Sequence, residues 1–431
     1  MLIRPAKRVV GAISVPGDKS ISHRAAILAA MADGQSEISH YLTGEDCLAT
    51  LRCLRQLGVE IEHVGTTVSV KGVGKSGFCA PDDPLDCGNS GTTMRLLAGV
   101  LAGQNFESTL TGDASLRRRP MNRIIEPLRL MGAEIDSNEG MAPLTIRGRN
   151  PLNAISYKLP VASAQVKSCV LLAGLNANGA TEVIERVATR NHTERMLRGL
   201  GVEVQISAAA EGKRISVSGD AHLSASVMHV PSDISGASFF IVAAACLEQS
   251  MLEVSNVGIN PTRAAVLEVL QGLGARMELD DQGESLGEPS ATLRITGGLV
   301  ASSSKGIIGG AAIANLIDEV PILAVFGTQI EGGIEFRDAA ELRVKETDRI
   351  SAIVENLRRM GAETEEFDDG FRVEKSQLIG AEVDSFGDHR IAMAFAVAGL
   401  LAKGDTTIKN PECADVSFPG FYETLESVVQ R

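Results

Sequence analysis

Tryptophan is absent from this chain of 431 residues, and only 3 tyrosines are present. Proteins that bind single-stranded nucleic acid commonly stack the bases on aromatic side chains, so this scarcity argues against such a role. Positive charge is also in deficit, because 41 Lys and Arg face 54 Asp and Glu and the formal net charge is −13. The long-range field would repel nucleic acid and anionic lipid. We therefore expect neither a nucleic-acid nor a membrane partner, and any affinity for anions must be local.

Paired cysteine motifs and long apolar runs are missing too. The 7 cysteines are odd in number and include no Cys-x-x-Cys, which is typical of reduced thiols in a cytosolic protein rather than of a disulfide framework or a zinc site. Early charges at the N-terminus are not followed by the apolar stretch of a secretion signal, and no segment approaches membrane-spanning length. The sequence predicts a soluble, cytoplasmic protein.

One phrase of apolar residues, glycine and strand formers recurs along the chain. Its first copy is Leu54-x-x-Leu57-Gly58-Val59-Glu60-Ile61, and the glycines of the later copies are Gly132, Gly201, Gly274 and Gly361. The apolar pair closes the stripe of a helix, and the glycine provides the left-handed conformation that ends it. The copies lie roughly 70–90 residues apart, a longer period than that of solenoid repeats. We expect six similar α/β modules, the sixth after Gly361, because chance recurrence of a helix stop would not space five copies so evenly.

The length predicts two domains, since single cores rarely grow beyond about 250–300 residues. We expect three modules in each domain and a crossing near Val230-Pro231-Ser232-Asp233, after the third copy of the phrase. This divides the chain into one domain of residues 16–231 and a second of residues 232–431, to which residues 1–15 return.

Cations gather at expected helix starts in the first half of the chain. Asp18 is expected to cap a helix in which Ser20 and Arg24 share one face, beside Lys19, and Gly91 begins another apolar helix among hydroxyl residues. Free N–H groups at such starts attract negative charge. Capped helices with solvated charges explain the first segment about equally well, but a glycine at the second start favours close contact with a ligand.

Two further segments of this half combine the same features. Arg119 is the last of three consecutive arginines and is restrained by the following proline, and a planar guanidinium suits bidentate binding of carboxylate or phosphate. The two preceding arginines are interpreted as an exposed patch. Ser163 and Gln165 open another apolar helix, where capping and ligand contact are compatible alternatives.

Acidic residues join the pattern in the second half. Asp318 and Glu319 interrupt an apolar run, and burial would raise the pKa of such a carboxyl group and make it a candidate base. Capping of the helix after Pro321 is a nearly equal alternative. Asp388 is expected to cap a helix whose entrance carries Arg390.

Lys345, Glu346 and Arg349 form the most specific segment. The two cations are four residues apart, and the carboxylate lies between them at an expected helix start. Cations are unfavourable there, so a bound anion would offset the cost, although a solvated salt-bridge face remains the alternative. These residues together predict an enzyme that acts on two small anions.

The motifs closely resemble those of the enolpyruvylshikimate-phosphate synthases, or 3-phosphoshikimate 1-carboxyvinyltransferases, across essentially the entire chain. The matching strings, in family order, are Pro16-Gly-Asp-Lys-Ser-Ile-Ser-His-Arg24, Gly88-Asn-Ser-Gly-Thr-Thr-Met-Arg95, Arg119-Pro120-Met121, Ser163-Ala-Gln165, Leu342-Arg-Val-Lys-Glu-Thr-Asp-Arg349 and Asp388-His-Arg390.

This resemblance implies an α/β fold of two domains, each built of three βαβαββ units, with a cleft between the domains. It implies transfer of the enolpyruvyl group from phosphoenolpyruvate to the 5-hydroxyl of shikimate 3-phosphate, with release of phosphate through a tetrahedral intermediate, in the shikimate pathway of aromatic amino-acid biosynthesis. No metal or organic cofactor is implied. The expected partners are the two small-molecule substrates, and we expect a monomer.

The resemblance also assigns roles to residues. Shikimate 3-phosphate would be held by Ser20, Arg24, Ser163, Thr189 or Arg190, Asp318 and Lys345. Phosphoenolpyruvate would be held by Lys19, Gly91, Arg119, Gln165, Arg349 and Arg390. Asp318 is the expected base toward the 5-hydroxyl, and Glu346 and Lys19 are both candidates for protonating the methylene carbon.

Four positions bear on how far the family pattern extends. Val416 stands where many members have a lysine near the phosphate of phosphoenolpyruvate, Ala164 replaces a serine and Glu341 replaces an asparagine. Gly91 is retained where a larger residue would narrow the phosphoenolpyruvate pocket, which predicts sensitivity to glyphosate.

Two alternatives stand beside this hypothesis. A UDP-N-acetylglucosamine enolpyruvyl transferase would share the fold and the donor, but the Lys19–Arg24 string is not its signature and no cysteine lies in a matching loop. A non-enzymatic anion-binding protein would use the basic clusters but would leave Asp318 and Glu346 without a task.

Overall fold

The computed structural model describes residues 1–302 and 306–431, and the chain divides into two compact units. Unit 1 comprises Met1–Pro16, Pro231–Gly283 and Pro289–Arg431, and unit 2 comprises Gly17–Val230 and Glu284–Glu288. Each unit has its own hydrophobic core. The domain division into residues 16–231 and residues 1–15 with 232–431 stays a proposal, and the compact units differ from it by grouping Glu284–Glu288 with the first half of the chain.

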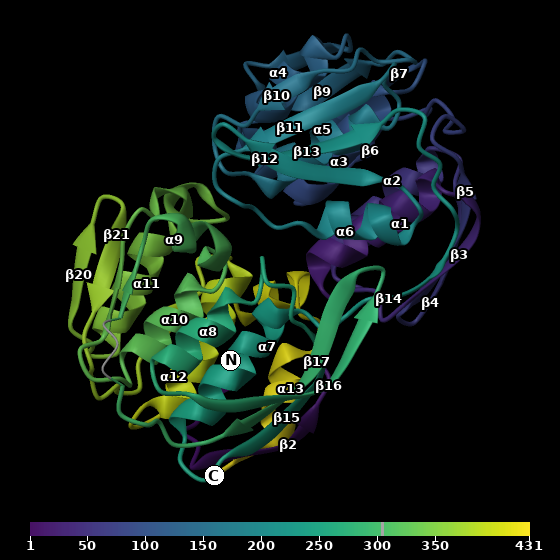
Figure 1. Ribbon diagram of the computed structural model, residues 1–431. Coiled ribbons are helices and arrows are strands. Elements are labelled where there is room, and N and C mark those ends of the chain that lie inside the picture. Colours follow the sequence, from purple (N-terminus) through teal and green to yellow (C-terminus); the bar gives the residue numbers. More distant parts are fainter. Residues whose placement is uncertain (303–305) are drawn as a thin grey trace. The chain divides into compact units, whose positions relative to one another are not determined.

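Unit 2 contains three modules of one topology, each with a four-stranded sheet (Figure 1). The second module runs β6 (Leu85–Asp86), α3 (Gly91–Ala102), β7 (Glu107–Thr111), α4 (Asn122–Leu130), β8 (Glu134–Asn138) and β9 (Met141–Arg147). The third runs β10 (Ser156–Lys158), α5 (Ala164–Gly174), β11 (Ala180–Glu185), α6 (His192–Gly199), β12 (Val204–Ala209) and β13 (Gly212–Ser218). In both, the first two strands are parallel and the last two join antiparallel.

The first module of unit 2 receives its first strand from the end of the unit. It runs α1 (Lys19–Met31), β3 (Asp33–Ser39), α2 (Glu45–Gln56), β4 (Glu60–Val64) and β5 (Thr67–Val73). The strand parallel to β3 is β14 (Val227–His229), which lies far along the chain. With this substitution the sheet has the same order as the other two.

Unit 1 repeats the theme with more variation. One sheet is formed by β2 (Arg8–Ile13), β15 (Met251–Gly258), β16 (Arg276–Ser285), β17 (Glu288–Thr296) and β24 (Val429–Gln430), with α7 (Ile234–Cys246), α8 (Ala265–Gly272) and α13 (Phe421–Val428). A second is formed by β18 (Ile307–Ile308), β19 (Ile334–Phe336), β20 (Thr364–Phe367) and β21 (Gly370–Val373), with α9 (Ala311–Leu316), α10 (Val320–Gly327) and α11 (Arg349–Arg359). The third is formed by β1 (Leu2–Ile3), β22 (Glu382–Asp384) and β23 (Thr406–Lys409), with α12 (His389–Leu401).

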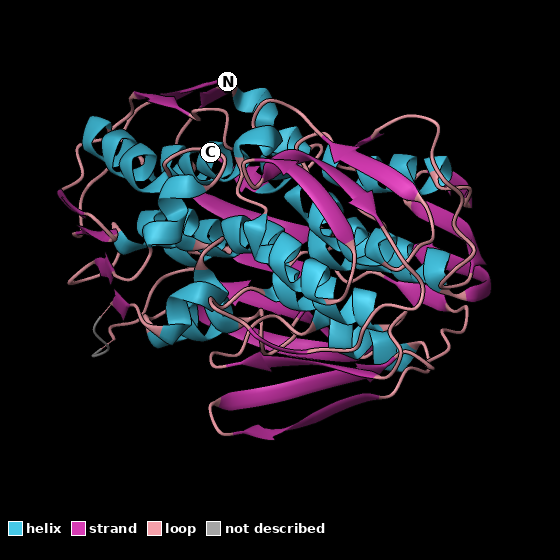
Figure 2. Ribbon diagram, turned by 90° about the horizontal axis from the view of Figure 1, so that it is seen from above, coloured by secondary structure: helices cyan, strands magenta, loops and turns pink. Residues whose placement is uncertain are grey.

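Central helices fill the core of each unit, and strands flank them (Figure 2). In unit 1, α7, α10 and α12 pack against one another and nearly all their residues are buried, as expected for helices that are apolar on every side. In unit 2, α3 and α5 approach so closely that a Cβ on Gly99 would lie 2.3 Å from the carbonyl oxygen of Cys169. The helix starts that bear the motifs are thereby held on rigid cores.

The repeated helix stop is confirmed in all five copies. The five glycines have φ between +80° and +107°, the left-handed conformation that favours glycine. In the first copy the N–H of Val59 donates to the carbonyl of Leu54 at 3.1 Å, and the equivalent bond occurs in the other four. This is the hydrogen bond of a Schellman motif, and each copy leads directly into a strand.

Candidate active site

The start of α1 in unit 2 carries the first predicted cluster. The Asp18 side chain accepts a hydrogen bond from the N–H of Ile21 at 2.8 Å, so the predicted cap is confirmed. Lys19 follows it, and its Nζ lies 3.2 Å from Oδ2 of Asp46. Both side chains are mostly buried, so the amine is directed by its carboxylate partner.

Arg24 is a buried cation whose side-chain hydrogen-bond acceptors are uncharged. Its Nε donates to Oγ1 of Thr193 at 2.8 Å, Nη2 donates to Oγ of Ser168 at 2.9 Å, and Nη1 donates to the carbonyl of Ser20 at 2.8 Å. Burial lowers the pKa of Arg24 to about 10, against the attraction of Glu194. The guanidinium therefore keeps its charge at neutral pH beside Ser20.

The start of α3 brings two guanidinium groups to Gly91. A Cβ on this glycine would lie 2.9 Å from Nη1 of Arg95 and 3.4 Å from Nη1 of Arg119. Arg95 Nη1 donates to Oε1 of Gln165 at 2.6 Å, and Arg119 Nη2 donates to Oδ1 of Asn89 at 2.7 Å. The structure thus unites Gly91, Arg119 and Gln165, which come from three separate motifs, around a helix N-terminus.

Arg95 was missed as a site residue in the sequence. It lies within the quoted glycine-rich string, but attention fell on the backbone N–H groups of that string. The signal that could have found it is its position, one helical turn after Gly91, which places its side chain back over the helix start. In the structure, Arg95 contacts Gln165 there.

A chain of neutral hydrogen bonds joins helices α1, α2 and α3 of unit 2. Nδ1 of the buried His23 lies 2.6 Å from Oγ1 of Thr50, which lies 2.7 Å from Oγ1 of Thr93, which donates to Oγ of Ser90 at 2.8 Å. Burial, and then the charges of Lys19 and Arg24, hold the pKa of His23 well below 6.5. A neutral imidazole thus fixes α1, α2 and α3 in one arrangement.

Ser163 confirms its predicted cap, because its Oγ accepts from the N–H of Val166 at 3.4 Å. Two residues after Gln165, Lys167 is completely buried and contacts Glu185 and Glu194. The loop between β11 and α6 carries Thr189 and Arg190. Lys167 therefore links the start of α5 to β11 and α6, the two elements that flank this loop. Thr189 and Arg190 are the two alternative residues expected to bind shikimate 3-phosphate.

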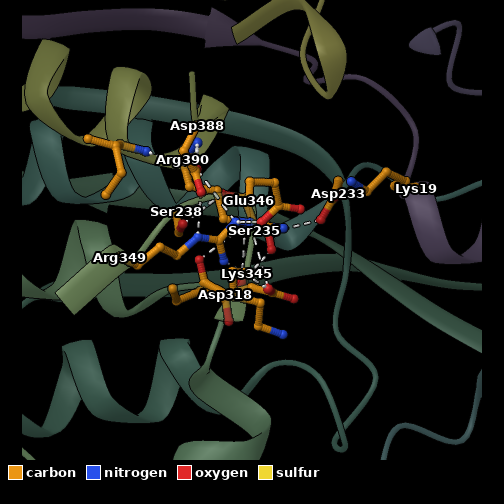
Figure 3. A network of polar contacts seen from close by, with 12 residues as sticks. Lys19, Asp233, Ser235, Ser238, Asp318, Lys345, Glu346, Arg349, Asp388 and Arg390 are labelled. Atoms are coloured by element: carbon orange, nitrogen blue, oxygen red, sulfur yellow. Dashed lines mark hydrogen bonds and ion pairs between the residues drawn. The ribbon is translucent and has the colours of Figure 1, made fainter. Parts of the chain in front are cut away.

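Arg349 is the centre of the polar network in unit 1 (Figure 3). Its Nε donates to Oδ2 of Asp388 at 2.7 Å, its Nη2 donates to Oε2 of Glu346 at 2.6 Å, and its Nη1 lies 3.6 Å from Oδ1 of Asp318. Burial lowers the pKa of Arg349, but the three carboxylates outweigh burial, so the pKa lies above its usual value. Nη1 is buried and has no hydrogen-bond partner among the described residues, so one edge of this guanidinium remains available to an anion.

Arg390 lies beside the same carboxylate. Its Nη1 donates to the carbonyl of Asp318 at 3.1 Å, and its Nε lies 3.7 Å from the Asp318 side chain. Asp388 begins α12 as predicted, because Oδ1 accepts from the N–H of Arg390 at 2.8 Å. One aspartate therefore caps α12 and orients Arg349.

Neither acid of the Asp318-Glu319 pair caps α10, so that alternative was wrong. Glu319 occupies the cap position without a side-chain capping bond. Its Oε1 instead lies 2.8 Å from Nη1 of the buried Arg263 and accepts from Ser235. The buried arginine drew the side chain away from the helix end, and no local sequence signal identified that partner.

The predicted helical pairing of Lys345 with Arg349 was also wrong. Helix α11 begins only at Arg349, with Asp348 as its cap, so Lys345 and Glu346 precede the helix. Nζ of Lys345 lies 3.2 Å from Oε1 of Glu341. Asp348 accepts from the N–H of Ser351, and this strong capping signal places the helix start after Lys345 and Glu346.

Within residues 1–302 and 306–431, no group of three or more His, Cys, Asp or Glu side chains could hold a metal ion. In the same described residues, no helix combines the length and apolar character needed to cross a membrane. The arrangement can bind anions through guanidinium, ammonium and N–H groups and can transfer protons at carboxylates.

Comparison with known proteins gives one consistent result. Residues 3–425 match the family model described as EPSP synthase (3-phosphoshikimate 1-carboxyvinyltransferase). Proteins of that name from Koribacter versatilis and Solibacter usitatus are each 49% identical to the chain, over 100% and 99% of it and 99% of their own lengths. A solved EPSP synthase from Acinetobacter baumannii is 43% identical, with a TM-score of 0.88 over 99% of this chain and 98% of that one. The likeness confirms the expected α/β fold of repeated βαβαββ units.

Proposed function

Because the chain belongs to the EPSP synthase family and transfers the enolpyruvyl group of phosphoenolpyruvate to shikimate 3-phosphate, we propose that its arginine-rich clusters bind the two substrates. The observation that carries this proposal is the buried Arg349, whose Nη1 lacks an acceptor among the described residues. Both substrates are anions, and anions bind to guanidinium groups through charge-assisted hydrogen bonds.

Phosphoenolpyruvate is assigned to Lys19, Gly91, Arg119, Gln165, Arg349 and Arg390. Support comes from Gly91, which leaves the N-terminus of α3 open next to two guanidinium groups. Nη1 of Arg349, which has no hydrogen-bond partner among the described residues, is the group of unit 1 that we assign to an anion.

Shikimate 3-phosphate is assigned to Ser20, Arg24, Ser163, Arg190, Asp318 and Lys345, with Thr189 as the alternative to Arg190. Support comes from Arg24, whose guanidinium charge is not matched by a hydrogen-bonded carboxylate. Ser20 and Ser163 lie at the starts of helices, where hydroxyl and N–H groups can be shared with phosphate.

The reaction needs an acid and a base in fixed positions. The acid, Glu346 or Lys19, protonates the methylene carbon of phosphoenolpyruvate, and the neighbouring carbon becomes cationic. The 5-hydroxyl attacks that carbon and gives its proton to Asp318, forming the tetrahedral intermediate. The conjugate base of the acid then takes a proton from the new methyl group, which restores the double bond as phosphate leaves.

The overall reaction is tested by phosphate release from purified protein given both substrates, with each omitted in turn. Release that requires both is the expected result. Release with UDP-N-acetylglucosamine in place of shikimate 3-phosphate, or no release at all, contradicts it.

The site assignment is tested with Arg349→Gln. We expect the KM for phosphoenolpyruvate to rise about 10- to 100-fold, because a charge-assisted hydrogen bond contributes roughly 1.5–3 kcal/mol. Arg359→Gln is the matched control, since Arg359 lies on the same helix and pairs with Glu355 on the exposed side. An unchanged KM in Arg349→Gln rules out the assignment.

Glyphosate should inhibit the enzyme, because Gly91 leaves the phosphoenolpyruvate pocket unobstructed. Gly91→Ala would place a methyl group against Arg95 and Arg119, so we expect weaker inhibition and a higher KM for phosphoenolpyruvate. Turnover unaffected by millimolar glyphosate in the unmodified protein contradicts the proposal. Val416, at the end of a 3-10 helix spanning Pro411–Val416, provides no cation to this pocket.

We also propose that the enzyme is a cytoplasmic monomer. Cysteines that form no disulfide among the described residues favour the cytoplasm. Sedimentation analysis should give the mass of one 45.4 kDa chain, and a dimer mass at micromolar concentration contradicts it.

A further inference from the structure

A completely buried lysine at the start of α5 is not explained by the assignments above. Nζ of Lys167 lies 3.0 Å from Oε2 of Glu185 and 2.7 Å from Oε1 of Glu194. It also donates to the carbonyl of Thr189 at 3.4 Å. The lysine therefore connects the first turn of α5, the end of β11 and the first turn of α6.

Glu185 also binds Thr189, the loop residue whose carbonyl accepts from Lys167. Its Oε2 accepts from the N–H of Thr189 at 3.2 Å and from Oγ1 of Thr189 at 2.8 Å. All three polar groups of this threonine are thus held by the Lys167–Glu185 pair. Thr189 is buried, and the residue that follows it is Arg190.

We call the bonds among Lys167, Glu185 and Thr189 the clamp. Residues next to it in sequence are the partners of Arg24. Ser168 and Thr193, next in sequence to Lys167 and Glu194, lie 2.7 Å apart through their hydroxyl oxygens and both accept from Arg24. Residues adjacent in sequence therefore hold Arg24, which is assigned to shikimate 3-phosphate, and Thr189, which precedes Arg190.

A gain in stability alone does not explain why a lysine and two glutamates are buried together here. Buried ion pairs are often no more stabilising than apolar residues of similar volume, and their value lies more often in fixing one geometry. Here the fixed geometry is that of a single loop position, because within the described residues the side-chain hydrogen bonds of Glu185 end on Lys167 and Thr189.

We propose that Lys167, Glu185 and Thr189 are positioning residues that hold Arg190 in place to bind shikimate 3-phosphate. This inference rests on the proposed role of Arg190. It predicts an effect confined to one of the two substrates, because the bonds of Lys167 and Glu185 hold Thr189, which precedes Arg190 on the loop between β11 and α6.

The direct test is Glu185→Gln, with kinetics measured separately for each substrate. The amide cannot accept all three donors, so we expect the KM for shikimate 3-phosphate to rise about tenfold. The KM for phosphoenolpyruvate and kcat should stay within about twofold. Equal changes in both KM values overturn the proposal.

Thr189→Val tests the same clamp without changing a buried charge. We expect about a fivefold rise in the KM for shikimate 3-phosphate and recovery in Thr189→Ser, which restores the hydroxyl. Thr181→Val is the matched control, because Thr181 is also buried and its hydroxyl has no partner among the described residues. A valine effect that serine does not reverse overturns the proposal.

Arg190→Ala separates this inference from the function on which it rests. If Arg190→Ala raises the KM for shikimate 3-phosphate while Glu185→Gln and Thr189→Val leave it unchanged, the positioning role is wrong and the site assignment stands. If Thr189→Val raises this KM but Arg190→Ala does not, Thr189 rather than Arg190 contacts the substrate. The positioning role is then wrong as well.

Discussion

The arginines of the two units have different partners. In unit 2, the guanidinium groups of Arg24, Arg95 and Arg119 donate to hydroxyl, amide and carbonyl oxygens. In unit 1, Arg349 donates to Asp388 and Glu346 and lies near Asp318. The first set is held in place by neutral acceptors and the second by carboxylates.

This difference bears on what each cluster does before substrate binds. Neutral acceptors orient a guanidinium without cancelling its charge, so the charge of Arg24 is left for an anion to match. Carboxylates oppose the charge of Arg349 at short range, where unit charges interact by several kcal/mol even at a surface. The same carboxylates provide groups that can move protons, so we expect Arg24 to act in binding and the acids of unit 1 to govern chemistry.

Among the variants that test this comparison between the two units, Lys19→Ala is expected to lower activity the most. We expect kcat/KM to fall about 10³-fold or more, which removes roughly 4 kcal/mol of transition-state stabilisation. The thermal unfolding midpoint should stay unchanged, because the amine does not fill the core. Lys71→Ala is the control, since Lys71 pairs with Glu60 on an exposed strand. Normal turnover in Lys19→Ala removes Lys19 from the mechanism.

Lys167→Met tests whether unit 2, like unit 1, depends on a buried cation that is paired with carboxylates. Two buried carboxylates would lose their shared cation, so we expect the free energy of unfolding to fall by about 3–5 kcal/mol. Urea denaturation measures this. The control is Lys158→Met, whose exposed pair with Glu211 should contribute less than about 1 kcal/mol. Similar losses in both variants contradict the distinction.

Glu346→Gln tests the acids of unit 1. We expect kcat to fall about 100-fold, the usual scale for loss of a general acid, with the fold kept because Arg349 retains Asp388. Glu355→Gln on the exposed side of α11 is the control. A rise in the KM for phosphoenolpyruvate without a change in kcat would mean that Glu346 only orients Arg349.

The neutral hydrogen-bonded chain of unit 2 predicts a small dependence of stability on pH. The folded pKa of His23 lies below 6.5, so the unfolded chain binds more protons between the two pKa values. The stabilisation is present above about pH 6.5 and is lost as the pH falls through the folded pKa. Urea denaturation across this window should show a shallower slope of the free energy of unfolding against pH for His23→Asn. His222→Asn, at an exposed position, should match the unmodified protein.

Much of the fold could be predicted because its signals are local. The five glycines end their helices wherever they occur, and Asp18, Ser163 and Asp388 accept from N–H groups two or three residues ahead. Each depends on a few neighbouring residues and on no distant part of the chain.

The site was predicted less completely because partners are chosen in three dimensions. Glu319 binds Arg263, which lies 56 positions away, and no spacing rule connects them. The burial of Lys167 between Glu185 and Glu194 depends on how α5 and α6 pack. The helix start at Arg349 was misplaced because the capping signal of Asp348, which is local, was not given its weight.

The strand β14 completes the first sheet of unit 2 from almost 200 residues downstream of β3, and β1 and β2 pair with strands near the C-terminus. A ribosome that has made only the first module has not yet made the strand that closes its edge, so that edge stays open until residues 227–229 emerge. Strand β2 can pair with β15 once residues 251–258 have emerged, whereas β1 has to await the synthesis of β23. Long-range closure of this kind slows folding and exposes unpaired edges, so truncation before β23 should leave β1 without its partner strand.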